Sequence, residues 1–487
     1  MEMSKRSRGE YLRGGGFALV LFLSAFAFHR MLYPIVIFNM DDWLYLVLRR
    51  LPFPQWRGWN PTRVLPELLM PLTAQAAARL IFPLTGDLID AIEIGMALVV
   101  SGFTALYACC CLFWLRRRLG VSEARGYGLT LLFLLLHLLV FKNQAKGIDH
   151  LLSGYYDATT YFFYLIPALW NASLVLYLHA SRYFSTRRGK PWPVRLLVCA
   201  ACYFALLSNL YQSVILAVYA ALHLLHHLIR ARQRGRLRWG RILPQLLILA
   251  AWAAVQVFEY FGGRADSLAG AGLGASLAQT GSLLLERLGS VNRLFALLLA
   301  AAVILLLVGW KSTPAPERRR LFRFLTAGGL TLLYEGLLCA ASVPSYIRRG
   351  DVLISVFFYL FLFLMGVLAL WLRRVKKSGL ILPGLLLACA LAVGLHAPSY
   401  RTRINAGLSP DTARAITRDI VAQVAAIDGQ EERPQVLVPR FGSADNWPLA
   451  LYGSPRVAQT QYAYGVIPDC PDFDFVVSES KNAEFGL

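Results

Sequence analysis

The chain has 487 residues, of which 57% are hydrophobic and only 16% are charged. Soluble globular domains are nearer a quarter charged, so this composition excludes an ordinary soluble protein. Repeated apolar runs of about twenty residues, the length that spans a bilayer as a helix, predict an all-α polytopic membrane protein. The net charge of +21 does not indicate a nucleic-acid partner, because the basic residues follow a membrane-topology pattern.

Eleven apolar ranges predict membrane spans, and the first is interpreted as a span because no small-x-small cleavage pattern of a signal peptide follows it. With the N-terminus inside, the cytoplasmic segments hold more than half of the 49 lysines and arginines. This positive-inside pattern predicts that the C-terminus lies outside. The ranges are 17–38, 89–113, 126–141, 159–181, 194–208, 211–229, 242–261, 293–310, 323–343, 352–372 and 380–397.

The chain is predicted to divide into a transmembrane domain, 1–397, and a small extracytoplasmic domain, 398–487. In the second domain, Ser409 is a plausible N-cap of a helix over 410–427, and short strands are expected at 436–438 and 473–477. These elements predict a small α/β unit on the outer side.

Two outer segments of the first domain stand out by composition. Residues 39–88 are rich in tryptophan and proline, which predicts interfacial helices on the outer leaflet. Residues 262–292 are rich in glycine, alanine and serine, which predicts a mobile loop. A tight turn is expected at Ser208-Asn209, where the apolar run 194–229 has its polar break.

The strongest candidate for catalysis is the adjacent pair Asp41 and Asp42, directly beyond the first predicted span. Neighbouring carboxylates raise each other's pKa, which suits a general base that takes a proton from a hydroxyl group. In an extended segment the two side chains would point to opposite sides, so only one is expected to be catalytic. We favour Asp41, with Asp42 binding a metal or orienting the acceptor. The alternative is that the pair marks the translocated end of a helix.

Basic residues at the outer face form a second group of candidates. The positive-inside rule does not require cations there, and arginine binds phosphate bidentately. We expect them to hold a lipid phosphate or diphosphate, with the pair Arg348-Arg349 foremost; ordinary phospholipid contact is the alternative. The group consists of Arg63, Lys142, Lys146, Arg264, Arg348 and Arg349.

Further substrate contacts are expected from an acid flanked by aromatic residues and from acids at the outer ends of spans. Tyr156 and Asp157 precede the fourth predicted span, an arrangement common where sugars stack and accept hydrogen bonds, although an interfacial aromatic belt is the alternative. Glu93 and Glu259 are expected to line the same outer cavity, since ionisable residues in spans are functional candidates. Trp43, Lys142 and Lys146 complete the predicted substrate contacts.

Several classes of protein are excluded by what the sequence lacks. It contains no P-loop, dinucleotide-binding glycine pattern, zinc-protease motif or serine-hydrolase elbow where these could work. No cytoplasmic loop is long enough to bind a nucleotide, so a donor must arrive through the membrane. Of the eight cysteines, all but Cys470 lie in predicted spans, which argues against an intrachain disulfide framework.

Together these features resemble the C-type glycosyltransferases. The motifs Asp41-Asp42-Trp43 and Trp59-Asn60-Pro61-Thr62-Arg63 are similar to those of bacterial polytopic transferases related to phage serotype-converting glucosyltransferases. The resemblance covers the architecture of 1–397. It implies a polyprenyl-phosphate sugar donor, transfer on the periplasmic or outer face of the bacterial inner membrane, inversion at the sugar carbon, and Asp41 or Asp42 as the base.

The acceptor implied is a cell-envelope glycan or a glycolipid, and the bilayer itself is a partner. A flippase and a polyprenyl-phosphate sugar synthase are the membrane proteins expected to act beside it. No cofactor is certain, and a divalent cation, Mg²⁺ or Mn²⁺, stays open. Two other functions stay open as well: a lipid-linked glycan polymerase or ligase, and a non-enzymatic lipid or polysaccharide transporter or flippase.

Overall fold

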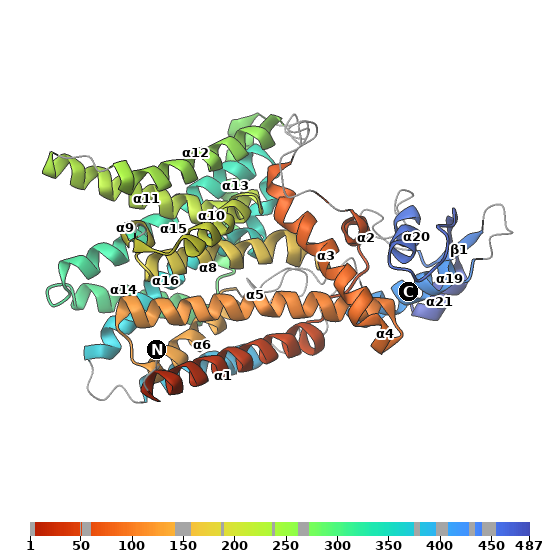
Figure 1. Ribbon diagram of the computed structural model, residues 1–487, viewed down its shortest axis with the longest axis horizontal. Helices are drawn as coiled ribbons and strands as arrows, with labels where there is room; N and C mark the ends of the chain where they lie inside the picture. The colour runs from red at the N-terminus through yellow and green to blue at the C-terminus, as the bar shows by residue number, and fades with distance from the viewer. Residues whose placement is uncertain are drawn as a thin grey trace.

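The computed structural model describes most of the chain and is dominated by helices that run along its long axis (Figure 1). All statements below concern the described residues. These are 5–48, 50, 60–141, 157–186, 189–235, 239–261, 272–374, 380–395, 408–427, 434–440 and 454–487.

Seven helical segments are long and apolar enough to cross a membrane, and three further apolar helices are shorter. The chain is therefore an all-α multi-pass membrane protein, apart from a small C-terminal unit. The helices of the bundle are α1 (Lys5–Ala27) with the π-helical turn η1 (Phe28–Leu32), α5 (Leu88–Leu119), α6 (Glu123–Leu139), α7 (Ala158–Thr160) with the π-helical turn η3 (Tyr161–Leu165), α8 (Ile166–Ala180), α10 (Trp192–Leu206), α11 (Leu210–Arg234), α12 (Trp239–Phe261), α14 (Arg293–Val308), α15 (Ala315–Ala341), α16 (Gly350–Arg374) and α17 (Ile381–Gly394).

Helices of the structure overlap all eleven predicted spans, and the turn expected at Ser208-Asn209 lies between α10 and α11. The number of membrane crossings and the side that each end faces stay predictions. Helix α16 is apolar almost all round and nearly every residue in it is buried, as expected of a central helix. Helix α5 ends at Gly120, whose φ of 63° lies in the left-handed region that glycine adopts without strain.

Shorter elements cover the end of the bundle that faces the C-terminal unit. They are α2 (Met40–Val47), the 3₁₀ turn η2 (Pro61–Arg63), α3 (Val64–Leu80), α4 (Phe82–Thr85), α13 (Leu273–Gly289) and the 3₁₀ turn η6 (Pro344–Arg348). The first four agree with the helices predicted within 39–88. The mobile loop predicted over 262–292 is wrong for 273–289, which form α13 and pack on α15 and η6. The six leucines of α13 favour a helix over a loop.

The C-terminal unit lies at one end of the long axis, and the N-terminus of the chain lies at the other (Figure 1). Its elements are α19 (Pro410–Ala425), β1 (Gln435–Val438), α20 (Ser454–Ala463), β2 (Asp474–Val477) and α21 (Glu479–Phe485). The predicted strands are confirmed and pair in parallel, with Val436 opposite Phe475. The Ser409 cap is also confirmed, since its side chain accepts a hydrogen bond from the amide of Thr412.

A contact between two short helices, α2 of the bundle and α20 of the C-terminal unit, joins this unit to the bundle. Helix α2 packs against α20, and the hydroxyl group of Tyr464 donates a hydrogen bond to the carbonyl oxygen of Leu46. The position of α2 is therefore fixed from both sides, by the bundle and by the C-terminal unit. We call this end of the molecule the C-terminal end, and the opposite one the N-terminal end.

Candidate functional site

The two aspartates of the predicted catalytic pair lie in the first turn of a helix, not in an extended segment as expected. Asn39 is the N-cap of α2, and its side chain accepts a hydrogen bond from the amide of Asp41 at 3.0 Å. Asp42 returns a bond by accepting from the amide of Asn39 at 3.1 Å. This capping box forms because asparagine and aspartate satisfy the free N–H groups of a helix start.

Asp42 is fully buried and holds α2 against the start of α7. One carboxylate oxygen accepts from the amide of Thr159 at 2.7 Å and from its hydroxyl group at 2.6 Å. The other accepts from the amides of Phe38 and Asn39. A carboxylate has about four acceptor positions, so none is left for a substrate proton. These contacts give Asp42 a structural role.

The carboxyl group of Asp42 is also shielded from water and faces a second acid. Burial raises its pKa well above the usual value, and the charge of Asp157 raises it further. Asp157 is buried too and caps α7 by accepting from the amide of Thr160 at 2.8 Å. The predicted sugar contact therefore positions the start of α7, and its buried carboxylate takes no part in the exposed surface.

Asp41 differs from its neighbour because its side chain is exposed at the surface of α2. Nearby protein atoms still displace part of its water and raise the pKa of its carboxyl group, while the guanidinium group of Arg63 opposes the shift. An accessible carboxylate with a raised pKa has the properties of a general base. The structure thus separates the two acids, and geometry favours Asp41.

Arg63 is close enough to Asp41 for its charge to act on that carboxyl group, and residues of two elements hold it in place. Its guanidinium group donates a hydrogen bond to the hydroxyl group of Tyr45 at 2.6 Å and lies 3.5 Å from the carboxylate of Glu67. Glu67 is buried and also pairs with Arg50 at 2.7 Å. One buried carboxylate thus faces two arginines. The side chain of Arg63 remains 21% exposed, so it can contact a ligand.

Arg349 is the second cation of this site and follows the turn η6. Its guanidinium group forms two bonds to the carboxylate of Asp351, at 3.0 and 2.6 Å, and lies 4.5 Å from the ring centre of Tyr164. Arg63 and Arg349 both act electrostatically on the hydroxyl group of Tyr164. Tyr164 belongs to the π-helical turn η3, a rare element that is frequent at functional sites.

Five residues, from the three elements α2, η2 and η3 and from the position that follows η6, are therefore linked by contacts or by their charges. We define the outer polar site, named for the side of the membrane on which the sequence predicts it, as Asp41, Tyr45, Arg63, Tyr164 and Arg349. It combines an exposed carboxylate with two arginines and two hydroxyl groups. Of the residues predicted from the sequence, it contains Asp41, Arg63 and Arg349. Tyr45 and Tyr164 were missed, because tyrosine at a membrane interface is common and carries no distinctive signal.

Other predicted residues lie elsewhere. Arg348 pairs with Glu286 on α13, and both side chains are largely exposed. Trp43 is buried within the core, so it offers no surface for a sugar. Lys142, Lys146, Tyr156 and Arg264 lie outside the described residues.

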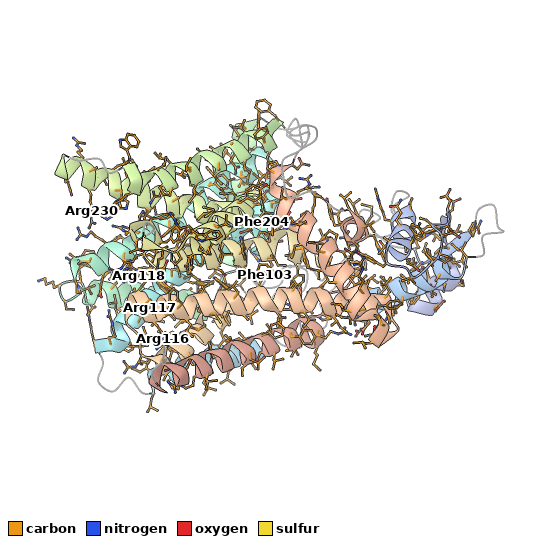
Figure 2. The ribbon with its side chains drawn as sticks, viewed as in Figure 1. Phe103, Arg116, Arg117, Arg118, Phe204 and Arg230 are labelled. Atoms are coloured by element: carbon orange, nitrogen blue, oxygen red, sulfur yellow. The ribbon has the colours of Figure 1, made fainter. Side chains whose placement is uncertain are left out.

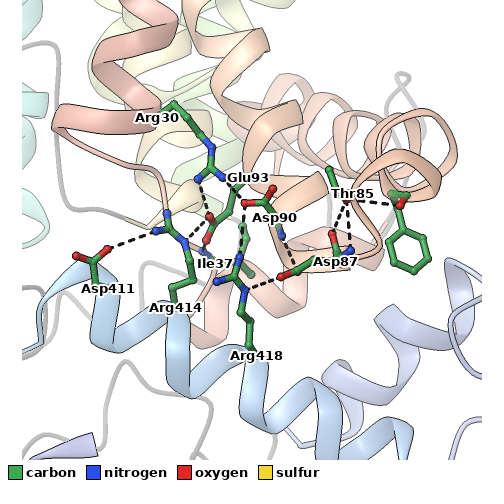
Figure 3. Close-up of polar contacts among 10 residues, drawn as sticks. Arg30, Ile37, Thr85, Asp87, Asp90, Glu93, Asp411, Arg414 and Arg418 are labelled. Carbon is green, nitrogen blue, oxygen red and sulfur yellow. Dashed lines mark hydrogen bonds and ion pairs between the residues drawn. The ribbon is translucent and has the colours of Figure 1, made fainter.

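Glu93 is part of a separate ionic network that joins the bundle to the C-terminal unit (Figure 3). It accepts a hydrogen bond from Arg414 of α19 at 2.8 Å and pairs with Arg30 at 3.5 Å. Glu259 does not accompany it, since that carboxylate accepts from the amide and hydroxyl groups of Thr62. The two glutamates thus have different partners, and the cavity expected to join them stays a prediction.

The same network includes Asp87 and Asp90, which pair with Arg418 and with Arg30 (Figure 3). A cavity of about 400 Å³ lies beside it and is lined by Arg30, Pro34 and Arg414, among others. The carboxylates around it neutralise the arginines. We call the set of Arg30, Asp87, Asp90, Glu93, Arg414 and Arg418 the outer ionic network.

The buried acids of this end do not form a ready-made site for a divalent cation. The described residues contain no group of three or more histidine, cysteine, aspartate or glutamate side chains that could hold a metal ion. Asp42 and Asp157 approach each other, but the acceptor positions of Asp42 are taken by N–H and O–H donors. An Mg²⁺ or Mn²⁺ ion requires free carboxylate oxygens instead.

The comparisons with known proteins add no family to these observations. No protein-family model matches the chain, and no curated protein matches it.

Proposed function

We propose that the chain is an integral membrane glycosyltransferase of the bacterial inner membrane that works on the periplasmic or outer face. It moves a sugar from a polyprenyl phosphate to a hydroxyl group of a cell-envelope glycan or glycolipid. The observation that carries the proposal is the outer polar site. The exposed acid Asp41 feels the charge of Arg63, and Arg63 and Arg349, both partly exposed, act on the same hydroxyl group, that of Tyr164.

The roles of these residues follow from their chemistry. The arginines offer N–H donors to the phosphate of the donor and neutralise the charge that develops on it as it leaves. The hydroxyl groups of Tyr45 and Tyr164 lie beside them, and burial raises the pKa of Tyr45, so its hydroxyl group stays protonated. A protonated phenol can donate a further hydrogen bond to phosphate or sugar oxygen.

The transfer balances with one base. The carboxylate of Asp41 takes the proton of the acceptor hydroxyl group, whose oxygen forms a bond to the anomeric carbon of the sugar. The bond from that carbon to the phosphate oxygen breaks, and polyprenyl phosphate leaves with the electron pair. Attack opposite the leaving group inverts the configuration. No second acid is needed, because a phosphate held by arginines is a good leaving group.

The proposal is tested by Asp41→Asn, which nearly preserves shape and removes the base. We expect turnover to fall on the order of 10²–10⁴-fold with donor binding intact, since removal of a general base costs about this much. The measurement is transfer of radiolabelled sugar from defined polyprenyl-phosphate sugars by the purified protein in lipid nanodiscs. Donor binding is measured separately with the same lipid.

Asp42→Asn is the matched control, because it makes the same chemical change at the next residue. We expect it to lower the thermal stability of the protein. The amide N–H₂ group of asparagine would face the N–H and O–H groups of Thr159, which now donate to the Asp42 carboxylate. Full transfer by a folded, donor-binding Asp41→Asn protein would refute Asp41 as the base.

A further inference from the structure

A second cavity, also of about 400 Å³, lies at the N-terminal end of the bundle, far from the outer polar site. Figure 2 labels two of its residues, Arg118 and Arg230, at the end opposite the C-terminal unit. The ends of α5, α8, α11 and α15 surround it. We call it the inner basic pocket. Six arginines line it: Arg118, Arg182, Arg230, Arg319, Arg320 and Arg323.

The charge of this pocket has no carboxylate paired with it, and the nearby Glu317 acts on Arg320 only from a distance. Its lining contains four histidines besides the arginines and no acidic residue. Among the described residues, no carboxylate forms an ion pair with any of the six arginines. Converging like charges repel one another, and a bound anion relieves the repulsion.

Two donors of the pocket face each other without an acceptor between them. The indole N–H group of Trp114 can only donate, and its nitrogen lies 2.8 Å from Nδ1 of His179. Nδ1 must therefore accept, which places the ring hydrogen on Nε2. That nitrogen lies 3.4 Å from Nη2 of Arg118, which also can only donate. An anionic oxygen that accepts from both groups would satisfy this arrangement.

The same reasoning shows which ring nitrogen of a second histidine carries the hydrogen. Arg323 Nη2 lies 2.9 Å from Nδ1 of His226, and because a guanidinium group only donates, that nitrogen accepts. The Nε2 atom of a neutral His226 then carries a hydrogen as well. In addition, the buried Nε atom of Arg118 has no hydrogen-bond partner among the described residues. The pocket thus presents donors from several elements and few acceptors.

The start of α15 reaches the pocket through Pro316, and the acid of this first turn, Glu317, pairs with Arg373 at 3.0 Å, outside the pocket lining. General positive-inside topology does not explain the convergence, because it requires basic loops and is satisfied by residues that do not line the pocket, such as Arg117.

We propose that the inner basic pocket binds a phosphate-bearing anion of more than one negative charge. Such an anion comes either from a soluble diphosphate or from the headgroup of an anionic lipid. The lipid source has a route, because Leu225, Leu228 and Ile229 of α11 are exposed beside the histidines and Arg230 of the pocket. The site is independent of the sugar transfer proposed for the outer polar site.

The experiment uses the full chain in nanodiscs and two probes. In the first arm, inorganic pyrophosphate is titrated by calorimetry into protein in phosphatidylcholine nanodiscs. In the second arm, nanodiscs with added cardiolipin are compared with phosphatidylcholine alone, and lipid retained by the protein is measured by native mass spectrometry. Binding in the first arm alone identifies a soluble phosphate, and binding in the second alone identifies a headgroup.

The decisive comparison is Arg118→Gln against Arg117→Gln. Both remove one charge from the same end of α5, but Arg117 is outside the pocket and lies over the ring of Phe113. We expect Arg118→Gln to weaken binding about tenfold or more, the effect of losing a charge-assisted hydrogen bond, and Arg117→Gln to weaken it less than about twofold. If Arg118→Gln does not fold, Arg319→Gln replaces it, with the same expectations.

Two results would overturn the proposal. Equal weakening by the pocket variant and by Arg117→Gln would mean that binding follows total charge alone. Absence of binding in both arms would mean that the pocket has no phosphate ligand. Binding in both arms, lost only in the pocket variant, supports recognition of the phosphate group itself.

Discussion

The outer ionic network and the inner basic pocket use the same side chain in opposite ways. In the network, Arg30, Arg414 and Arg418 each pair with carboxylates of α5 or of its N-cap, and the charges join two parts of the molecule (Figure 3). In the pocket, six arginines converge with no carboxylate among the lining residues. An arginine whose charge is neutralised within the protein stabilises the fold, whereas one left without a counterion is available to a ligand.

The outer polar site is intermediate between these two extremes. Arg63 and Arg349 each have an acidic partner, Glu67 and Asp351, yet each side chain keeps about a fifth of its surface exposed. The partners hold the guanidinium groups in place without covering them. Such preorganisation lowers the entropy cost of binding a phosphate.

The largest effect on stability is expected when the outer ionic network loses a carboxylate, because its arginines are then left without a counterion, as in the inner basic pocket. Glu93→Gln removes the buried charge that Arg30 and Arg414 share. Breaking a buried ion pair leaves an uncompensated charge, so we expect a loss of about 3 kcal/mol in the free energy of unfolding. Thermal unfolding measures the loss, and limited proteolysis measures release of the C-terminal unit.

Asp411→Asn is the control for this prediction. It removes a carboxylate that pairs with the same Arg414 at 3.5 Å but is 92% exposed. Exposed pairs contribute less than about 1 kcal/mol. Equal destabilisation by the two variants would contradict the structural role assigned to Glu93.

A smaller effect is expected from Arg349→Gln, which removes one bidentate donor from the outer polar site. We expect the affinity for a polyprenyl-phosphate sugar to fall by about 2 kcal/mol, or roughly thirtyfold, because a hydrogen bond between charged groups is lost. Equilibrium binding of the donor lipid in nanodiscs measures the change. Unchanged affinity would leave Arg349 with only its structural contact to Asp351.

The pH dependence of transfer should report the environment of Asp41. Its pKa is raised in the folded protein, so the base becomes protonated at a higher pH than an ordinary aspartate. The rate should fall tenfold per pH unit below that pKa. Because a raised pKa means that the folded state favours the protonated form, stability contributed by this group is lost as pH rises, not as it falls.

Loss of transfer on acidification therefore cannot arise from unfolding through Asp41. Circular dichroism and thermal unfolding across the same pH range provide the check. In the Asp41→Asn protein, the acidic limb of the residual rate should disappear. A residual rate with the same acidic limb would assign the titration to another group.

The smallest effect is expected from Arg348→Gln. This arginine precedes Arg349 but pairs with Glu286 at the surface, where 47% of its side chain and 65% of that of Glu286 are exposed. Surface pairs contribute at most about 1 kcal/mol, so stability and donor affinity should barely change. A loss of affinity equal to that of Arg349→Gln would remove the distinction that the structure makes between the two.

The sequence by itself determined the helical membrane architecture, because hydropathy acts residue by residue along the chain and needs no tertiary contact. It also located the capped helix and the two strands of the C-terminal unit, whose signals are local. It identified Asp41, Arg63 and Arg349 as candidates by their place near predicted outer ends of spans. It favoured Asp41 over Asp42, but only because one of the two was expected to face the acceptor, and it could not separate Arg349 from Arg348, which share the same local features.

Only the tertiary structure decided that ranking, because it depends on which groups meet. Thr159, 117 residues away in the chain, donates two hydrogen bonds to the carboxylate of Asp42. Arg414, 321 residues away, donates one to the carboxylate of Glu93. The inner basic pocket likewise exists only where the ends of four helices converge. Charge along a sequence is additive, but the environment of each charge is set by neighbours that the sequence keeps far apart.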